Sequence, residues 1–343
     1  MKDKKLKVGI AGYGVVGKRR RLHIDKHPNF KTVAVSDITI SPEVKEHENA
    51  KAFHNYDDLL CEPLDIVFVC LPNYLAPQIT IKALKRGFHV FCEKPPGQNV
   101  SDIEQVIKEE KHHPHLVLKY GFNHRYHDSV MQALQIINGG KMGEIINVRG
   151  VYGKSKVVDF SGGWRAERKY SGGGILLDQG IHMVDLIRFF CGEFYEVKSF
   201  ISNDFWKYDV EDNAYALMRN SKGVVAMLHS SATQWEHKFL LTISLTKGSI
   251  ELSGFLTGSK SYGEEMLIIR MRDNAYHGTV REERIKYLDD HSWEDEIDEF
   301  ADAIIEHKKL VYGTSEDALK TMKLVYGIYQ SDTDWCEKYN IKI

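Results

Sequence analysis

A glycine-rich segment near the beginning of the chain constrains the fold more than any other feature. It directly follows an apolar run, 7–11, and it consists of Gly12, Tyr13, Gly14, Val15, Val16 and Gly17. Three glycines at this spacing occur where a strand turns tightly into a helix whose first backbone N–H groups face a pyrophosphate. The pattern therefore predicts a βαβ unit. The first glycine forms the turn, the second admits the phosphates and the third lets the helix pack on the strand.

Short apolar runs continue to alternate with amphipathic stretches over the first 120 residues. We predict strands at 7–11, 32–36, 65–71, 89–92 and 116–120, with helices such as 76–86 and 101–112 between them. The run 65–71 is continuously apolar after its first residue, Asp65, which is typical of a strand buried on both faces. This alternation predicts an α/β protein in which residues 1–123 form a doubly wound Rossmann domain.

From residue 124 onward the pattern changes. We expect helices at 128–138, 177–190, 294–307 and 315–329. Alternating strand-like runs lie at 144–153, 196–202, 213–218, 224–231, 239–245, 249–252 and 266–271. Residues 124–343 are therefore expected to form an α+β domain with a large, mainly antiparallel sheet.

Composition argues against several classes of partner. The chain carries 46 Lys and Arg against 48 Asp and Glu, so we expect no nucleic-acid partner. No apolar run approaches the roughly 18 residues that span a bilayer, so we expect no membrane partner. The five cysteines are scattered without a C-x-x-C pair, which predicts no metal site and favours a reducing, cytoplasmic location.

An acidic residue at the end of the second predicted strand indicates which dinucleotide binds. Asp37 lies 25 residues after Gly12. A carboxylate at this position accepts hydrogen bonds from the adenosine ribose and repels a 2′-phosphate, so NAD is expected in preference to NADP. The alternative is a glycine turn capped by an aspartate. The basic run 18–21 predicts either phosphate contacts or a solvated helix face.

Two further segments lie at the carboxyl ends of predicted strands, where ligands of such sheets bind. One contains Leu71, Pro72 and Asn73, and the Asn73 amide either contacts the cofactor near the nicotinamide ribose or caps the next helix. The other contains Glu93 and Lys94 before two prolines, where a cis bond is possible. A lysine held in this turn can polarise a substrate hydroxyl or act as an acid or base, and an ordinary surface turn is the alternative.

The third candidate site follows a run of three glycines, 172–174. If 177–190 is one regular helix, Asp178, His182 and Asp185 share a face, because they are spaced four and three residues apart. An imidazole oriented by a carboxylate can act as general base for an alcohol proton, although a lone helical histidine is usually structural. The glycines are expected to permit close approach to something bulky.

In their order along the chain, these segments resemble the glucose–fructose oxidoreductase, inositol dehydrogenase and MocA family. The resemblance covers nearly the whole chain and rests on the glycine pattern, Asp37, the Glu-Lys-Pro segment, Asn123 and Arg125, Trp164 and Arg165, and the glycine run that leads to Asp178 and His182. It implies a Rossmann domain followed by an α/β domain whose open sheet forms a homodimer or homotetramer. It also implies reversible hydride transfer between NAD and a sugar or cyclitol carbon.

The resemblance also implies roles for particular residues. Lys94, Asp178 and His182 match the catalytic positions. We expect His182 to be the base, Asp178 to orient it, and Lys94 to bridge the substrate hydroxyl and the nicotinamide ribose. Asn123 is expected to bind the cofactor, and Arg125 the substrate.

The segment before the glycine run suggests further substrate contacts. The Trp164 indole can stack on a sugar ring, and the Arg165 guanidinium can bind a hydroxyl or phosphate. Arg168 and Lys169 either extend an anion site or form a solvated charge run. Segments 119–128 and 164–178 resemble those of family members from surface-polysaccharide biosynthesis. This favours a nucleotide-linked or phosphorylated sugar over a free sugar or inositol.

The leading hypothesis is an NAD-dependent sugar oxidoreductase. The alternatives are an inositol dehydrogenase, a redox-neutral glycosidase or epimerase that retains its NAD, and a non-catalytic regulator that senses NAD and sugar. The presence of Lys94, Asp178 and His182 counts against the regulator. NAD that co-purifies tightly without net NADH production would indicate the redox-neutral enzyme.

Overall fold

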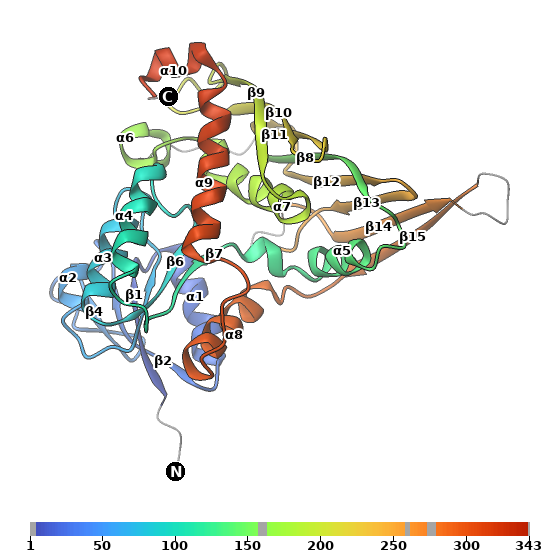
Figure 1. Cartoon of the computed structure of the whole chain (residues 1–343). Coiled ribbons are helices and arrows are strands. Elements are labelled where there is room, and N and C mark those ends of the chain that lie inside the picture. The colour runs from blue at the N-terminus through green and yellow to red at the C-terminus, as the bar shows by residue number, and fades with distance from the viewer. Residues whose placement is uncertain (1–4, 157–162, 258–260, 273–278, 342–343) are drawn as a thin grey trace. The chain divides into compact units, whose positions relative to one another are not determined.

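The computed structural model describes residues 5–156, 163–257, 261–272 and 279–341, which form two compact units (Figure 1). The first unit contains the residues up to Phe122 together with Trp293–Leu319. The second unit contains Asn123–Ser292 and the residues from Lys320 onward. The predicted domains meet once, after residue 123. In the structure, the later segment Trp293–Leu319 also belongs to the first unit.

The first unit is built on a seven-stranded sheet in the order β3-β4-β2-β1-β5-β6-β7. Its strands are β1 (Leu6–Ala11), β2 (Phe30–Ser36), β3 (Glu46–His47), β4 (Ala50–Phe53), β5 (Ile66–Val69), β6 (His89–Glu93) and β7 (Leu118–Gly121). All neighbours pair in parallel except β3 and β4. The strand order changes direction beside β1, which is where doubly wound sheets bind their ligands. This confirms the predicted Rossmann domain.

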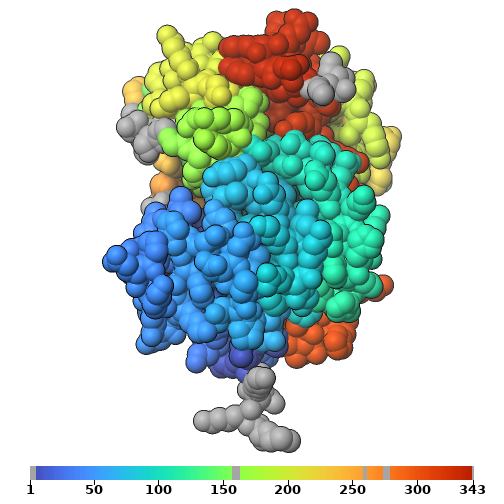
Figure 2. Space-filling model, turned by 90° about the vertical axis from the view of Figure 1, so that its left-hand side faces the viewer, coloured from blue at the N-terminus to red at the C-terminus, as the bar shows by residue number. Residues whose placement is uncertain are grey.

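Helices cover this sheet. α1 (Val15–Lys26) packs on β1 and β2, and α3 (Ala76–Lys85) packs on β5 and β6. α4 (Val100–Glu110) packs on α3, and the short α2 (Tyr56–Leu59) contacts β2 and β4. α2, α3 and α4 belong to the surface coloured from blue to teal in Figure 2.

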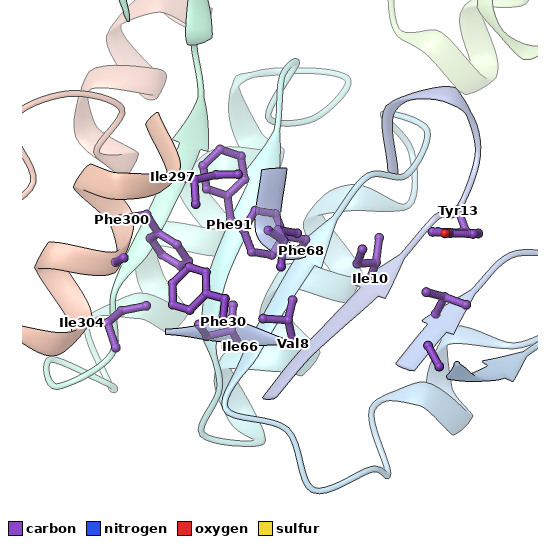
Figure 3. Close-up of a cluster of buried hydrophobic side chains, with 14 of the residues drawn as sticks. Val8, Ile10, Tyr13, Phe30, Ile66, Phe68, Phe91, Ile297, Phe300 and Ile304 are labelled. Atoms are coloured by element: carbon purple, nitrogen blue, oxygen red, sulfur yellow. The ribbon is translucent and has the colours of Figure 1, made fainter. Parts of the chain in front are cut away.

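The core of the first unit explains why a late segment of the chain belongs to it. Phe68 and Phe91, from β5 and β6, stack with ring centroids 4.8 Å apart, and Phe300 of α8 (Ser292–Ile305) meets both rings edge-on (Figure 3). Ile297 and Ile304 enter the same cluster from one turn before and one turn after Phe300. This spacing gives α8 an apolar face that the Rossmann sheet buries.

The second unit contains an eight-stranded sheet in the order β15-β14-β13-β12-β8-β11-β10-β9. Its strands are β8 (Ile145–Ser155), β9 (Phe194–Ser202), β10 (Asn213–Asn220), β11 (Val225–Gln234), β12 (Lys238–Leu245), β13 (Gly248–Ser253), β14 (Glu265–Arg272) and β15 (Val280–Tyr287). Only β8 and β11 pair in parallel among these described strands. The predicted large and mainly antiparallel sheet is therefore confirmed.

Helices pack on this sheet as well. α7 (Ile181–Cys191) contacts β8 and β11, and α5 (Asp128–Asn138) contacts β13 and β14. α9 (Ser315–Gln330) contributes to both units because the boundary falls after Leu319, and α10 (Thr333–Tyr339) follows it. Within the described residues, no helix is long and apolar enough to cross a bilayer.

Two differences from the predicted elements have physical causes. Strand β15 is not predicted, because five of its eight residues are charged, and as an edge strand it has little apolar surface to bury. The predicted helix 177–190 is two elements, a π-helical turn at Leu176–Gly180 followed by α7. A π-turn inserts an extra residue per turn, which alters the spacing of side chains around the axis.

Candidate active site

The turn between β1 and α1 is shaped by its glycines. Gly12 has a φ of +93°, and a Cβ there would lie 2.3 Å from the Cys70 carbonyl oxygen. A Cβ on Gly17 would lie 2.0 Å from the Gly12 carbonyl oxygen. By contrast, no described atom lies within 4 Å of the Cβ position on Gly14. Gly12 and Gly17 are thus required for the turn and its packing, and Gly14 leaves room for a ligand.

The N-terminus of α1 fits an anionic group. Gly14 is the N-cap residue, no side chain caps this end, and Val15 is 81% exposed. The first N–H groups of a helix have no acceptor within the helix, and the helix dipole favours negative charge there. The turn therefore offers an open set of donors of the kind that binds a pyrophosphate.

Asp37 joins the end of β2 to this turn. Its carboxylate accepts hydrogen bonds from the Tyr13 N–H at 2.9 Å and from the N–H and hydroxyl of Thr39 at 2.9 and 2.7 Å. A carboxylate has about four acceptor positions, so capping the turn leaves capacity for a ribose hydroxyl. The Tyr13 side chain points elsewhere, since its hydroxyl accepts from Arg21 and donates to Glu48, both at 2.8 Å. Tyr13 thus contributes its backbone N–H, and not its side chain, to the turn.

The segment after β5 contributes one candidate side chain. Leu71 lies against the turn, with Cδ2 3.1 Å from the Cβ position on Gly12. Asn73 is buried two residues further on, after Pro72. The N-cap position of α3 belongs to Leu75, two residues after Asn73. A contact between Asn73 and the cofactor stays a prediction.

A buried arginine holds the end of β6. Arg20 of α1 donates from Nε to Glu93 at 2.5 Å and from Nη2 to Glu296 at 2.7 Å. Its guanidinium lies over the rings of Phe91 and Trp293, 4.3 and 4.2 Å from their centroids. Arg20 has no exposed surface, so the prediction of phosphate contacts or a solvated face for the basic run is wrong at this position.

These contacts place Glu93 and Lys94 beside a charged cluster at the end of β6. Burial raises the pKa of Glu296 to about 7, although Arg20 acts in the opposite direction. The Glu93 carboxylate binds Arg20, and the Lys94–Pro95 peptide is cis. A cofactor contact by Glu93 and the catalytic role of Lys94 stay predictions.

In the second unit, Asp178 lies between two cations. Its carboxylate is 3.5 Å from Nζ of Lys154 and 3.6 Å from Nε of Arg165. Asp178 belongs to the π-helical turn and Lys154 to the end of β8. The assumption of a regular helix through Asp178 and His182 is therefore wrong, and orientation of His182 by Asp178 stays a prediction.

His182 lies against a second histidine. Its imidazole stacks on that of His124, with centroids 3.6 Å apart and an interplanar angle of 10°. His124 belongs to the 3-10 turn η1 (Asn123–Tyr126), and both rings are buried. Asn123 forms contacts within the second unit, at 3.1 Å to Ser292 Oγ and 3.2 Å to His124 Nδ1. A cofactor contact by Asn123 stays a prediction.

Tyr152 completes this cluster. Its hydroxyl is 3.1 Å from Nε2 of His124, and its ring meets Tyr262 edge-on. Burial raises the pKa of Tyr152 well above 10, and the nearby Asp178 carboxylate acts in the same direction. The phenol therefore keeps its proton near neutral pH, so Tyr152 does not act as a proton acceptor.

The glycine run is packed against the protein itself. A Cβ on Gly174 would lie 2.1 Å from the Glu211 carbonyl oxygen, and a Cβ on Gly173 would lie 2.3 Å from the Tyr329 hydroxyl. The buried Glu211 carboxylate accepts from the N–H groups of Gly174 and Leu176 at 2.8 and 3.0 Å. The bulky neighbour that the glycines admit is thus Glu211 and its surroundings.

Arg125 has a different role from the predicted one. Its guanidinium forms a bidentate ion pair with Asp185, with both N–O distances 2.6 Å, and both side chains are buried. Asp185 also accepts from the Thr321 hydroxyl at 2.9 Å. Arg125 therefore joins η1 to α7, and the prediction of a substrate contact is corrected to a structural role.

The remaining cations differ in exposure. Arg165 is 47% exposed and lies over the Trp164 ring, 4.3 Å from its centroid. Arg168 donates from Nε to the Asp209 carbonyl oxygen at 3.0 Å and lies over the Tyr339 ring. Lys169 pairs with Glu167 at 3.0 Å. Arg168 and Lys169 therefore do not form the proposed anion site.

Family models match both parts of the chain. Residues 6–121 match the oxidoreductase family with an NAD-binding Rossmann fold, GFO_IDH_MocA. Residues 130–251 match the GFO/IDH/MocA C-terminal domain. The chain belongs to this family. It is accordingly an NAD-binding oxidoreductase of a family of sugar dehydrogenases, as the resemblance of its motifs predicts.

Named relatives share much of its length. D-glucoside 3-dehydrogenase from Escherichia coli is 28% identical over 256 residues, which cover 67% of this chain and 71% of the relative. The crystal structure of myo-inositol 2-dehydrogenase from Lactobacillus plantarum is 25% identical with a TM-score of 0.79, covering 96% of this chain and 98% of that one. Levoglucosan dehydrogenase in complex with NADH has the same fold, with 20% identity, a TM-score of 0.83, and coverage of 97% and 98%.

Several residues of the site are absent from the sequence predictions. Lys154 lies two positions after Tyr152 on β8, so strand periodicity could have placed both on one face. His124 stands between two residues of a predicted motif, but its neighbour His182 is distant in sequence. Nothing local indicates Glu211, or the ion pairs that Arg20 forms, because the partners come from other elements.

Proposed function

We propose that this protein is an NAD-dependent dehydrogenase that oxidises a secondary hydroxyl on a sugar or cyclitol ring and catalyses the reverse reduction. The observation that carries the proposal is the pairing, in one chain, of an open dinucleotide turn with a buried cluster around His182 and Asp178. The first part binds a redox cofactor and the second can accept a proton, which are the two requirements of alcohol oxidation.

The residues of the first unit fit NAD. The open position at Gly14 and the N-terminus of α1 suit the pyrophosphate, and Asp37 suits the adenosine ribose. Asn73 and Glu93, at the carboxyl ends of β5 and β6, would lie toward the nicotinamide ribose. When bound, NAD supplies the hydride acceptor.

Side chains of the protein carry out the proton transfer from the substrate hydroxyl. We assign the role of base to His182, whose imidazole takes the proton of the substrate hydroxyl as the C–O bond becomes a carbonyl. Lys94 donates a hydrogen bond to the same oxygen and stabilises negative charge there. Asp178, held by Lys154 and Arg165, is the carboxylate to which we assign the orientation of the imidazole.

The charges of the second unit bear on the substrate class. Arg168 and Lys169, the pair predicted to bind a phosphate, are used within the protein, and Arg165 pairs with Asp178. This pairing favours an uncharged ring over the nucleotide-linked or phosphorylated sugar that the sequence predicts. D-glucoside 3-dehydrogenase and levoglucosan dehydrogenase are named for uncharged sugars of this kind.

A panel of compounds tests the proposal. UDP-, GDP- and dTDP-sugars, hexose phosphates, free hexoses, methyl glucosides and inositols are each added to the NAD-loaded protein, and NADH absorbance and the melting temperature are measured. A ligand at 100 times its Kd adds roughly 2.7 kcal/mol to the stability. We expect NADH production with an uncharged ring. A melting shift without any NADH signal would contradict the proposal and favour the retained-cofactor enzyme or the regulator.

The predicted self-association has a candidate surface. On one face of the second sheet, neighbouring strands expose large apolar side chains, namely Phe200, Tyr215, Leu217, Val225 and Met227. All of them except Val225 border a hollow of about 360 Å³. A monomer rarely exposes a continuous apolar patch of this kind, so we propose that a second copy covers it. Sedimentation of wild type and Leu217→Lys tests this, and a wild-type monomer would refute it.

A further inference from the structure

His124 has no role in the chemistry assigned so far, although its ring stacks on that of His182. The two imidazoles are almost parallel, with centroids 3.6 Å apart, and they are 6% and 4% exposed. Parallel rings at this distance do not hydrogen-bond to each other through their edges. The contact is therefore a stack, and its effect depends on the protonation state of His124.

One end of His124 is fixed by a chain of hydrogen bonds. The Ser292 hydroxyl donates to the Asp290 carboxylate at 2.6 Å, because a carboxylate only accepts. The Ser292 oxygen then accepts from the Asn123 amide nitrogen at 3.1 Å. The amide oxygen of Asn123 consequently faces His124 Nδ1 at 3.2 Å, and Nδ1 must carry a proton to donate to it.

The other end of His124 is fixed by a phenol. The Tyr152 hydroxyl lies 3.1 Å from Nε2 of His124. Burial raises the pKa of Tyr152, so the hydroxyl keeps its proton and is able to donate a hydrogen bond. Because Nδ1 already carries the imidazole proton, we assign this hydroxyl as the donor to Nε2. An imidazole that donates at Nδ1 and accepts at Nε2 is neutral.

The groups packed around His124 leave this state undisturbed. The rings of Phe255 and Phe239 meet it edge-on, at 4.8 and 6.2 Å between centroids. His127 meets it edge-on at 5.6 Å, and the Nδ1 atom of His127 is 2.7 Å from the Glu265 carboxylate. That carboxylate is therefore engaged by His127. Lys154 of β8 and Asp178 of the π-helical turn pair with each other, 3.5 Å apart.

We propose that His124 is a positioning residue. Held as the neutral Nδ1–H tautomer by Asn123 and Tyr152, it fixes the plane of the His182 imidazole by stacking. It carries no charge that would oppose proton uptake by His182. The inference rests on the proposed function in one respect, since it takes His182 to be the base.

The tautomer can be measured without any substrate. The full chain is labelled with ¹⁵N-histidine, and long-range ¹H–¹⁵N correlations near neutral pH are assigned with the variants His124→Phe and His182→Ala. We expect His124 to be neutral with its proton on Nδ1. Tyr152→Phe, which removes the hydroxyl that faces Nε2, should disturb this signature. Tyr287→Phe, which removes a hydroxyl that donates to Gln132, should leave it unchanged. A charged His124, or one protonated only on Nε2, would overturn the proposal.

Kinetics test the stack. With methyl β-glucoside or myo-inositol and NAD, His124→Ala should lower kcat on the order of 10- to 100-fold with little change in KM, because the base loses its alignment. His124→Phe keeps a ring in place and should lose no more than about threefold. Melting curves of both variants report on folding. Equal losses in the two variants, or an effect confined to KM, would contradict positioning by the ring. If the wild type oxidises no compound of the panel, the proposed function fails while the tautomer measurement still decides the state of His124.

Discussion

The turn in the first unit and the histidine cluster in the second are held in place by different means. The turn is set by consecutive residues, and three glycines provide its geometry through the backbone. The cluster is set by side chains from η1, β8 and α7, which are far apart in sequence. A cofactor shared by many proteins can be bound by backbone groups, whereas a proton acceptor needs side chains in a particular protonation state.

The largest effect is expected from a pair of matched glycine variants, which tests whether Gly12 and Gly14 have separate roles in the turn. Gly12→Ala places a Cβ against the Cys70 carbonyl at a positive φ, so we expect a loss of stability on the order of 3 to 5 kcal/mol. Gly14→Ala meets no described atom, so its stability should change by less than about 1 kcal/mol. Its affinity for NAD should nevertheless fall at least tenfold, or about 1.4 kcal/mol. Urea unfolding and calorimetric titration measure both, and equal stability losses would contradict separate roles.

The first unit could be predicted well because its information is local. Five of its seven strands follow from continuous apolar runs between helical stretches, and the turn follows from glycine spacing. The sequence could not place α8 there, because an amphipathic helix has an apolar face without indicating which sheet will bury it. Phe300 reaches Phe68 and Phe91 only in the folded chain.

The buried cluster around Arg20 provides a pH-dependent test within the first unit. The pKa of Glu296 rises from an ordinary value of 4.5 to about 7, so the folded state holds a proton that the unfolded state has lost. The stability that this proton provides is complete below about pH 4.5 and is lost as the pH rises to about 7, by as much as about 3 kcal/mol.

The variant Glu296→Gln does not titrate at this position. We therefore expect its stability to fall less than that of the wild type between pH 5 and 8, and urea unfolding at several pH values measures the difference. Other groups titrate in both proteins, so the wild type serves as the control. Parallel curves for the two proteins would show that Glu296 is ionised throughout, with Arg20 compensating for its burial.

The preference for NAD over NADP tests whether the Asp37 carboxylate faces the adenosine ribose. We expect NAD to bind at least tenfold more tightly than NADP, a difference of about 1.4 kcal/mol, because Asp37 would face the 2′-phosphate. Asp37→Ser keeps a polar side chain at the turn and should narrow that difference. Fluorescence titration of both cofactors measures it. Equal affinities in the wild type would mean that Asp37 only caps Tyr13 and Thr39.

The second unit shows why its site was only partly predictable. The spacing of Asp178 and His182 predicts that they share one face of a helix, but their geometry depends on a π-turn that the pattern does not reveal. The resemblance implies a substrate contact for Arg125, and the sequence does not show its ion pair with Asp185, because the two residues are distant in sequence. His124 gave no local sign, since its role comes from the ring that it meets after folding.

The central claim is that the first unit binds NAD and that His182 of the second unit accepts the proton. The variant His182→Ala tests this claim most directly, when its affinity for NAD and its turnover of the compound identified by the panel are both measured. For this variant we predict a Kd for NAD within about twofold of the wild type. We predict a kcat lower by a factor on the order of 10² to 10⁴, the range typical of a positioned base. Near-normal turnover would show that the proton acceptor lies elsewhere. A loss of NAD binding equal to the loss of turnover would contradict the assignment of cofactor binding and proton transfer to different units.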